Sequence, residues 1–219
     1  AMVHRSVQRY RKELIPDRHF DLEGHAYLAD IYNDQSREIA LYKSGQVGIS
    51  EYLLSYALHS CDQRSATVLY VFPKDNLVSD FSAARLGPAI EASSYLQSII
   101  VEGASAGGTK GADRGTLKRV RNRFLYMRGG AVSPDGSSSQ LKGVDADSCI
   151  ADELDECDPR VPGLLDKRLG HSKIKEKRFA STPSYHDRGI HAFWKGSTQN
   201  LWMVRCHSCG NRQDLAMSD

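Results

Sequence analysis

The sequence lacks a long apolar run. No apolar stretch approaches the roughly 18 residues that a membrane-spanning helix needs. The polar N-terminus also lacks the apolar segment of a secretory signal. Both absences argue against a membrane partner and predict an intracellular protein.

The sequence also lacks a sizeable net charge of either sign. Lysine and arginine total 29 residues, and aspartate and glutamate total 27, which leaves a formal net charge of +2 at pH 7. A chain this close to neutral has no global basic field that would indicate nucleic-acid binding. Any such contact must therefore come from local basic clusters.

Cysteine is scarce, and its pattern argues against a disulfide framework. The total of five is odd, and Cys61, Cys149 and Cys157 are scattered along the chain. Reduced thiols are the favoured interpretation of this pattern.

The sequence does contain an alternation of strand-like and helix-like segments, in a chain of 219 residues that can bury one domain with a small appendage. Residues 66–72 form a near-continuous β-type run, which is typical of a strand buried on both faces of a parallel sheet. The alternation predicts an α/β domain with a mostly parallel sheet. The other expected strands are 37–41, 124–127, 148–153 and 177–182, and the expected helices are 52–58, a segment from Asp75 or Asn76 that stops at Gly87-Pro88, and 89–96.

The segment Tyr42–Glu51 has the character of a phosphate-binding loop, because it follows a strand-like run and opens a helix-like run. The usual pattern is G-x-x-x-x-G-K-[ST], in which the lysine reaches the β- and γ-phosphates. Gly48 and Ser50 fit this pattern, but Ile49 stands at the lysine position and Lys43 stands at the front of the loop. By itself the segment fits an ordinary strand–turn–helix somewhat better than a nucleotide-binding loop.

Residues 20–32 place aromatic and apolar groups at helical spacing just before this loop. ATPases of this general kind often build their adenine pocket there. Core packing is the alternative for each single residue.

An acid pair, Asp152-Glu153, ends the strand expected at 148–153. In nucleotide hydrolases with a phosphate loop, the first acid holds Mg²⁺ and the second polarises the attacking water. The surroundings are rich in acids, so a chance pair is the alternative.

Two basic segments are candidates for contact with a DNA backbone. Residues 3–18 are basic and helix-permissive, with a solvated helix face as the alternative. Residues 103–115 hold five glycines and precede the cations Lys118, Arg119, Arg121 and Arg123. A mobile loop flanked by cations suits a phosphate backbone, and a charged edge strand is the alternative.

Cys206 and Cys209 form a C-x-x-C knuckle next to Gly210. Such a pair is half of a structural zinc site, which needs four ligands. His207 or His191 could contribute a ligand, a second pair could lie downstream, or the thiols could be free.

Taken together, these segments resemble the ATPase domain of phage large terminase subunits, the motors that pump DNA into preformed capsids. The resemblance is closest to the lambda-like branch and covers roughly residues 20–215. That branch carries its loop lysine at the front, as Lys43 does here. Asp152-Glu153 is similar to the family's acid pair, Ser181-Thr182-Pro183 to its coupling segment, and Cys206–Gly210 to its cysteine knuckle.

The resemblance implies a P-loop NTPase of the RecA/ASCE-like class, a three-layer sandwich that hydrolyses ATP with Mg²⁺. The nucleotide-binding residues would be Lys43, Ser44, Gly45, Gln46, Val47, Gly48, Ile49, Ser50 and Glu51. The catalytic residues would be Glu153 and Lys43, the Mg²⁺ ligands Ser50 and Asp152, the zinc ligands Cys206 and Cys209, and the coupling residues Ser181, Thr182 and Pro183. Arg85 and Arg128 are the candidates for an arginine finger.

The same resemblance implies a basic segment at 1–19, an ATPase domain at 20–190 and a knuckle segment at 191–219 that is cut off before a nuclease domain. The expected partners are double-stranded DNA, a portal protein and a small terminase subunit, in a homo-oligomeric ring in the host cytoplasm. A helicase or other translocase, or a catalytically dead nucleic-acid-binding module, are the alternatives.

Overall fold

A computed structural model of the chain describes residues 22–101 and 116–214. The predictions for residues 3–18 and 103–115 lie outside the described residues. No helix in the described ranges is long and apolar enough to cross a lipid bilayer.

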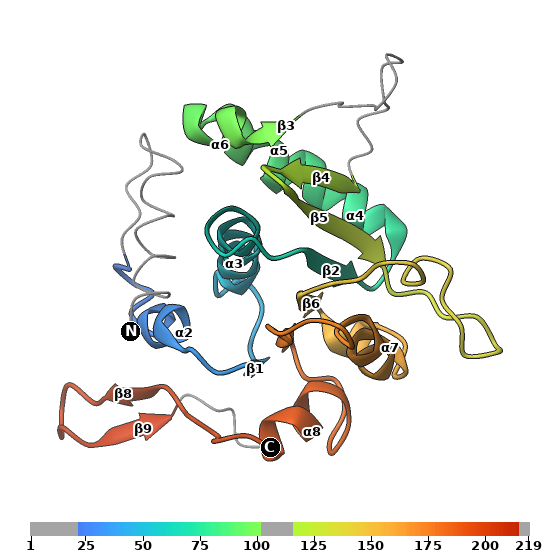
Figure 1. The fold of residues 1–219 in the computed structure, drawn as a ribbon. Helices are drawn as coiled ribbons and strands as arrows, with labels where there is room; N and C mark the ends of the chain where they lie inside the picture. Colours follow the sequence, from blue (N-terminus) through green and yellow to red (C-terminus); the bar gives the residue numbers. More distant parts are fainter. Residues whose placement is uncertain (1–21, 102–115, 215–219) are drawn as a thin grey trace, which may run out of the picture.

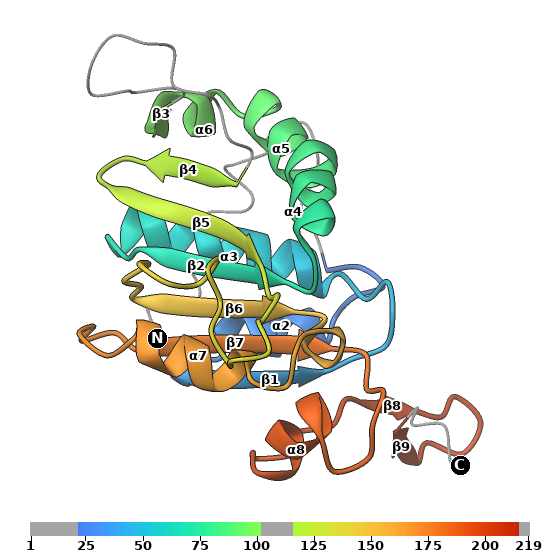
Figure 2. The ribbon, with the colours of Figure 1, turned by 90° about the vertical axis from the view of Figure 1, so that its right-hand side faces the viewer.

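The central sheet has seven strands in the order β1-β7-β6-β2-β5-β4-β3. The five strands from β1 to β5 in this order pair in parallel, and β4 and β3 complete one edge in antiparallel fashion. This topology confirms the predicted mostly parallel sheet (Figure 2). The strands are β1 (Glu38–Tyr42), β2 (Val68–Phe72), β3 (Ile100–Val101), β4 (Leu117–Val120), β5 (Arg123–Gly129), β6 (Ser148–Asp152) and β7 (Glu176–Ser181).

Helices cover both faces of this sheet, which gives the predicted three layers (Figure 1). Alternate residues of β2 show the division: Val68 and Tyr70 belong to the apolar core under α3, whereas Leu69 and Val71 belong to the core under α7. The helices are α2 (Leu28–Asn33), α3 (Ile49–Gln63), α4 (Asp75–Phe81), α5 (Gly87–Glu91), α6 (Ser94–Ile99), α7 (Val161–Arg168) and α8 (Gly189–Lys195), and a separate hairpin pairs β8 (Met203–Arg205) with β9 (Arg212–Asp214).

The prediction that a helix stops at Gly87-Pro88 is wrong. The chain continues from α4 through a π-helical turn, Ser82–Leu86, directly into α5 (Figure 2). The Gly87 N–H donates to the Ser82 carbonyl. Pro88 then lies in the first turn of α5, where its missing N–H costs no helical hydrogen bond.

The single helix expected at 89–96 is instead divided between α5 and α6. The Ser93 side chain accepts a hydrogen bond from the Leu96 N–H at 3.2 Å and caps a new helix. Ser93 has an extended backbone, so α5 ends before it and α6 begins after it.

The three scattered cysteines are free thiols, as predicted, and all three are buried in the core. Burial raises the pKa of Cys61, Cys149 and Cys157 to about 12 in each case. These thiols are therefore protonated and unreactive near neutral pH.

A buried charge network joins α3 to β7. The Glu176 carboxylate accepts hydrogen bonds from Tyr56 Oη at 2.5 Å and from the Arg64 guanidinium at 2.6 and 2.8 Å. Arg178, which is fully buried, lies 3.7 Å from the same carboxylate and 4.5 Å from the Tyr56 ring centroid. Burial by itself would raise the pKa of Glu176, but the bonds from Arg64 and Tyr56 hold that pKa below its ordinary value.

Replacing Glu176 with glutamine should destabilise the fold, because it leaves the buried Arg178 charge without its counter-charge. We expect a loss of about 3–5 kcal/mol in the free energy of unfolding at pH 7, measured by denaturant titration. Because the pKa of Glu176 is depressed, the wild-type advantage should vanish as the pH falls through that pKa.

The matched control is Glu38→Gln, which removes an exposed carboxylate on β1 that pairs with Lys177 at 2.8 Å. This exposed pair should contribute less than about 1 kcal/mol. Equal effects of the two substitutions would contradict the role assigned to the buried network.

Candidate functional site

The loop between β1 and α3 has the backbone of an anion-binding turn. Gly48 precedes the first residue of α3 with φ of 75°, and a Cβ at this position would approach the Leu28 side chain to 3.3 Å. Glycine meets both constraints at no cost. The loop therefore delivers the chain into a fifteen-residue helix whose first N–H groups have no partner within the helix.

Tyr27, from the segment that precedes β1, binds this loop through a hydrogen bond. Its hydroxyl donates to the Val47 carbonyl at 3.0 Å, and its ring lies edge-on to Trp202 with centroids 6.2 Å apart. The segment expected to pack or to bind adenine thus contacts the loop directly.

The register of three parallel strands brings Lys43 to Glu153. Leu41 on β1 and Asp152 on β6 both pair with Ala180 on β7, so the three strands end in step. Lys43 follows β1 and Glu153 follows β6, and the two residues face each other across the end of β7. Lys43 Nζ donates to Glu153 Oε1 at 2.5 Å. The lysine side chain is 8% exposed and the glutamate 36%.

Ser50 and Asp152 meet beside this ion pair. Ser50 Oγ donates to Asp152 Oδ2 at 2.8 Å, and the hydroxyl of Tyr70 donates to the same oxygen at 3.1 Å. Asp152 is buried, and burial raises its pKa above the ordinary value. Sequence reasoning missed Tyr70, because a tyrosine in an apolar strand resembles any other core residue.

The segment after β7 contacts both sides of the site. The Ser181 carbonyl accepts from the Lys43 N–H at 3.1 Å, and the Thr182 N–H donates to Glu153 Oε2 at 3.2 Å. Glu153 is therefore held at both carboxylate oxygens. Its backbone has φ of 50°, in the left-handed region, so the acid pair turns sharply out of β6.

Asp155 is a second residue that sequence reasoning missed. Its carboxylate accepts from the Ser184 N–H at 2.8 Å and from the Ile190 N–H at 2.7 Å, and so joins the acid turn to the start of α8. The approach requires Gly189, because a Cβ there would lie 2.1 Å from Asp155 Oδ1. In the sequence Asp155 is one acid among many.

The two arginine-finger candidates occupy different surroundings. Arg85 donates to Glu51 Oε1 at 2.5 Å, next to the start of α3. Arg128 donates to the backbone carbonyls of Thr116 and Met127 at 2.8 and 2.9 Å. Of the two, Arg85 thus contacts a residue of the loop segment.

The cysteine knuckle forms the turn of the β8–β9 hairpin. The Cys206 N–H donates to the Asn211 carbonyl at 2.8 Å, and backbone N–H groups of Cys209 and Ser208 lower the pKa of the Cys206 thiol. Within the described ranges, no histidine, cysteine or acid joins the two thiols as a third ligand of a metal-binding group. The zinc prediction finds no support there.

Comparison with known proteins places this arrangement in a family. The sequence profile described as "Phage terminase large subunit gpA, ATPase domain" matches residues 27–219. The chain belongs to this family. No curated protein matches it.

Solved structures show the same fold. The large terminase of bacteriophage HK97 is 12% identical, with a TM-score of 0.61 over 87% of this chain. The large terminase ATPase domain of Thermus phage P74-26 is 13% identical, with a TM-score of 0.57 over 93% of this chain and 80% of its own. This terminase chain spans only 40% of the HK97 protein. The fold is thus that of the P-loop terminase ATPases, as the resemblance of the sequence implied.

Neutralising Asp152 should stabilise the nucleotide-free terminase domain. Because burial raises the pKa of Asp152, its ionisation above that pKa opposes folding. Asp152→Asn keeps hydrogen-bonding atoms near Ser50 and Tyr70, and we expect a gain of about 1 kcal/mol in the free energy of unfolding at pH 7, without Mg²⁺. The gain should shrink as the pH falls and the wild-type carboxyl takes up its proton.

Asp158→Asn is the matched control, because the Arg160 side chain lowers the pKa of Asp158 to about 2. Its neutralisation should weaken the fold at pH 7. A loss of stability in Asp152→Asn as well would contradict the assignment of a destabilising buried charge.

Proposed function

We propose that this terminase domain binds ATP over the loop at residues 43–51 and hydrolyses it to drive double-stranded DNA into a procapsid. The observation that carries the proposal is the joining of Lys43 to Glu153 and of Ser50 to Asp152 where β1, β7 and β6 end. A cation, a hydroxyl and two acids at the start of a long helix are the groups that phosphoryl transfer uses.

Ser50 and Asp152 fit a Mg²⁺ ion. Their oxygens are the hard donors that Mg²⁺ prefers, and they already lie 2.8 Å apart. Among the described residues, the buried Asp152 carboxylate has no cationic hydrogen-bond partner, since its bonds there come from two hydroxyls and a backbone N–H. When bound, the ion would neutralise charge on the phosphates.

The loop residues would hold the phosphates through backbone N–H groups, with the α3 dipole adding to the attraction. Lys43 would exchange its partner, from the Glu153 carboxylate to the β- and γ-phosphates. This exchange would free Glu153 Oε1 to orient the attacking water and to accept its proton. In this scheme the protein keeps its general base inactive until the nucleotide arrives.

Thr182 supplies the physical basis for coupling. Its N–H donates to the second carboxylate oxygen of Glu153 at 3.2 Å. A movement of this carboxylate would therefore also move the Ser181-Thr182-Pro183 segment. Asp155 connects the same turn to α8. We infer that the state of the γ-phosphate reaches the DNA-gripping parts along this route.

Family membership also motivates the assembly. We propose contact with a portal protein and a small terminase subunit, in a homo-oligomeric ring in the host cytoplasm. Exposed Arg119 and Arg123 beside the turn between β4 and β5 are candidates for contact with the DNA backbone. An arginine finger, for which Arg85 and Arg128 are the candidates, could act from a neighbouring subunit.

Replacing Glu153 with glutamine should abolish ATP turnover and leave Mg²⁺–ATP binding largely intact. Glutamine keeps the shape of the side chain but cannot accept the proton. We expect a rate loss of about 10²-fold or more in the assembled motor, measured as phosphate release, with nucleotide affinity from calorimetry.

Glu156→Gln, a neutralisation three residues away on the exposed side of the same turn, is the matched control and should leave turnover unchanged. Normal hydrolysis by Glu153→Gln would show that another group is the base.

A further inference from the structure

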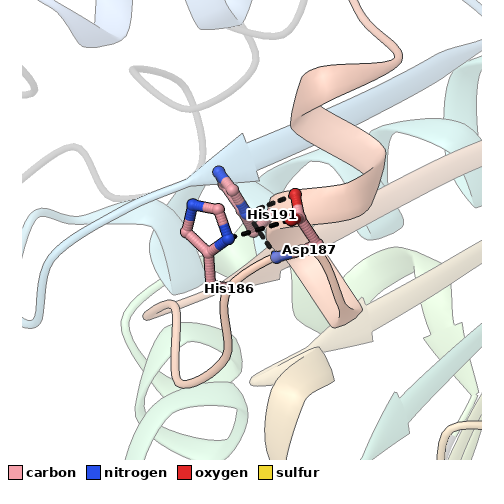
Figure 3. A group of neighbouring side chains, drawn as sticks. All are labelled: His186, Asp187 and His191. Atoms are coloured by element: carbon pink, nitrogen blue, oxygen red, sulfur yellow. Dashed lines mark hydrogen bonds and ion pairs between the residues drawn. The ribbon is translucent and has the colours of Figure 1, made fainter.

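His186, Asp187 and His191 form a compact cluster at the turn between β7 and α8 (Figure 3). One potential ligand atom from each residue lies within 4.8 Å of the other two. Within the described ranges this is the single group of three or more such residues. The cluster is separate from the Ser50–Asp152 pair and from the cysteine knuckle.

The three side chains converge on one point. His186 Nδ1 lies 2.9 Å from Asp187 Oδ2, and His191 Nδ1 lies 3.8 Å from Asp187 Oδ1. The two imidazole centroids are 4.7 Å apart (Figure 3). Small side-chain rotations would bring three donors to the distances of about 2.0–2.2 Å that a zinc-like ion requires.

The chemical state of each group suits a metal ion. The Asp187 N–H donates to His191 Nδ1 at 2.8 Å, so the ring is a neutral imidazole whose one lone pair is used in this bond, and a metal ion at Nδ1 would take the place of that N–H. Asp187 Oδ1 accepts a hydrogen bond from the Lys195 ammonium at 2.6 Å, the contact that a carboxylate makes with a cation. Neutral imidazole and carboxylate are the forms that ligate metals.

The positions of the ligands also favour binding. His191 is held in place, because its side chain is only 13% exposed and its ring stacks on Trp194 with centroids 6.0 Å apart. His186 is 81% exposed and can move toward an ion at little cost. The backbone of Asp187, with φ of 59°, turns its side chain into the cluster at the start of α8.

We propose that His186, Asp187 and His191 bind one divalent transition-metal ion of the zinc class. Imidazole with carboxylate suits Zn²⁺, Ni²⁺ or Co²⁺ rather than Mg²⁺ or Ca²⁺. Three protein ligands leave a fourth position for water. The ion would fasten the turn after Ser181-Thr182-Pro183 to the first turn of α8, independently of nucleotide.

Lys195 offers a substitution that should strengthen metal binding rather than weaken it. Its Nζ lies 2.6 Å from Asp187 Oδ1 and competes with a metal ion for that carboxylate. Lys195→Gln removes the competing cation and should tighten metal binding, whereas loss of a ligand should weaken it.

The experiment titrates Zn²⁺ into tag-free protein by calorimetry, with Cys206 and Cys209 both replaced by serine so that thiols cannot bind. We expect about one equivalent to bind, with affinity reduced at least about tenfold in His186→Ala and in Asp187→Asn. Co²⁺ should give visible absorption bands without a thiolate charge-transfer band.

His171→Ala, which removes an exposed histidine from the turn between α7 and β7, is the matched control and should bind as the parent does. Because His186 is exposed, its replacement does not threaten folding. No saturable binding, binding unchanged in His186→Ala and Asp187→Asn, or weaker binding in Lys195→Gln would each overturn the proposal.

Discussion

The ion pair between Lys43 and Glu153 is the interaction on which the candidate site depends. The pair forms because β1 and β6 lie on either side of β7 and end at the same level. The residue that follows β1 therefore meets the residue that follows β6 at the carboxyl ends of the strands. A lysine at the usual loop position would enter from α3. In this terminase the charge enters from the end of β1, which explains how Ile49 can be apolar and buried in the core without removing a cation from the site.

The same edge of the sheet carries an energetic cost. Asp152 is buried with a raised pKa, and Glu153 has a left-handed backbone and is held at both oxygens. Buried charge and backbone strain of this kind are what a binding site retains at the expense of stability. The Glu176 carboxylate, at the opposite end of β7, is instead bound closely by Tyr56 and by the Arg64 guanidinium.

The sequence predicted those parts of the site that depend on neighbours along the chain. The loop, the acid pair and the Ser181-Thr182-Pro183 segment each follow a strand, and strands can be recognised from apolar runs. Asp155 escaped recognition because its role depends on the close approach of Gly189, which is distant in sequence. The His186–Asp187–His191 cluster escaped recognition for a different reason: its residues are near in sequence, but a turn and one helical turn must fold before the three side chains meet.

The helix boundaries near Gly87-Pro88 were missed on different grounds. Glycine followed by proline usually ends a helix, but here a π-helical turn leads into α5, which begins at Gly87 and has Pro88 in its first turn. Packing therefore outweighs the preference of glycine and proline to end a helix, because Leu86, Ala89 and Ile90 are all buried in the same core as α3. The residues next to Gly87-Pro88 in the sequence could not show whether the helix stops there or continues.

The central claim is that Lys43 leaves Glu153 for the phosphates when nucleotide binds. A crystal structure of the domain with a non-hydrolysable ATP analogue and Mg²⁺ tests it most directly. We expect Lys43 Nζ within hydrogen-bond distance of a β- or γ-phosphate oxygen, with Glu153 released toward the water. A lysine that still lies 2.5 Å from Glu153 Oε1 while other groups hold the phosphates would contradict the account.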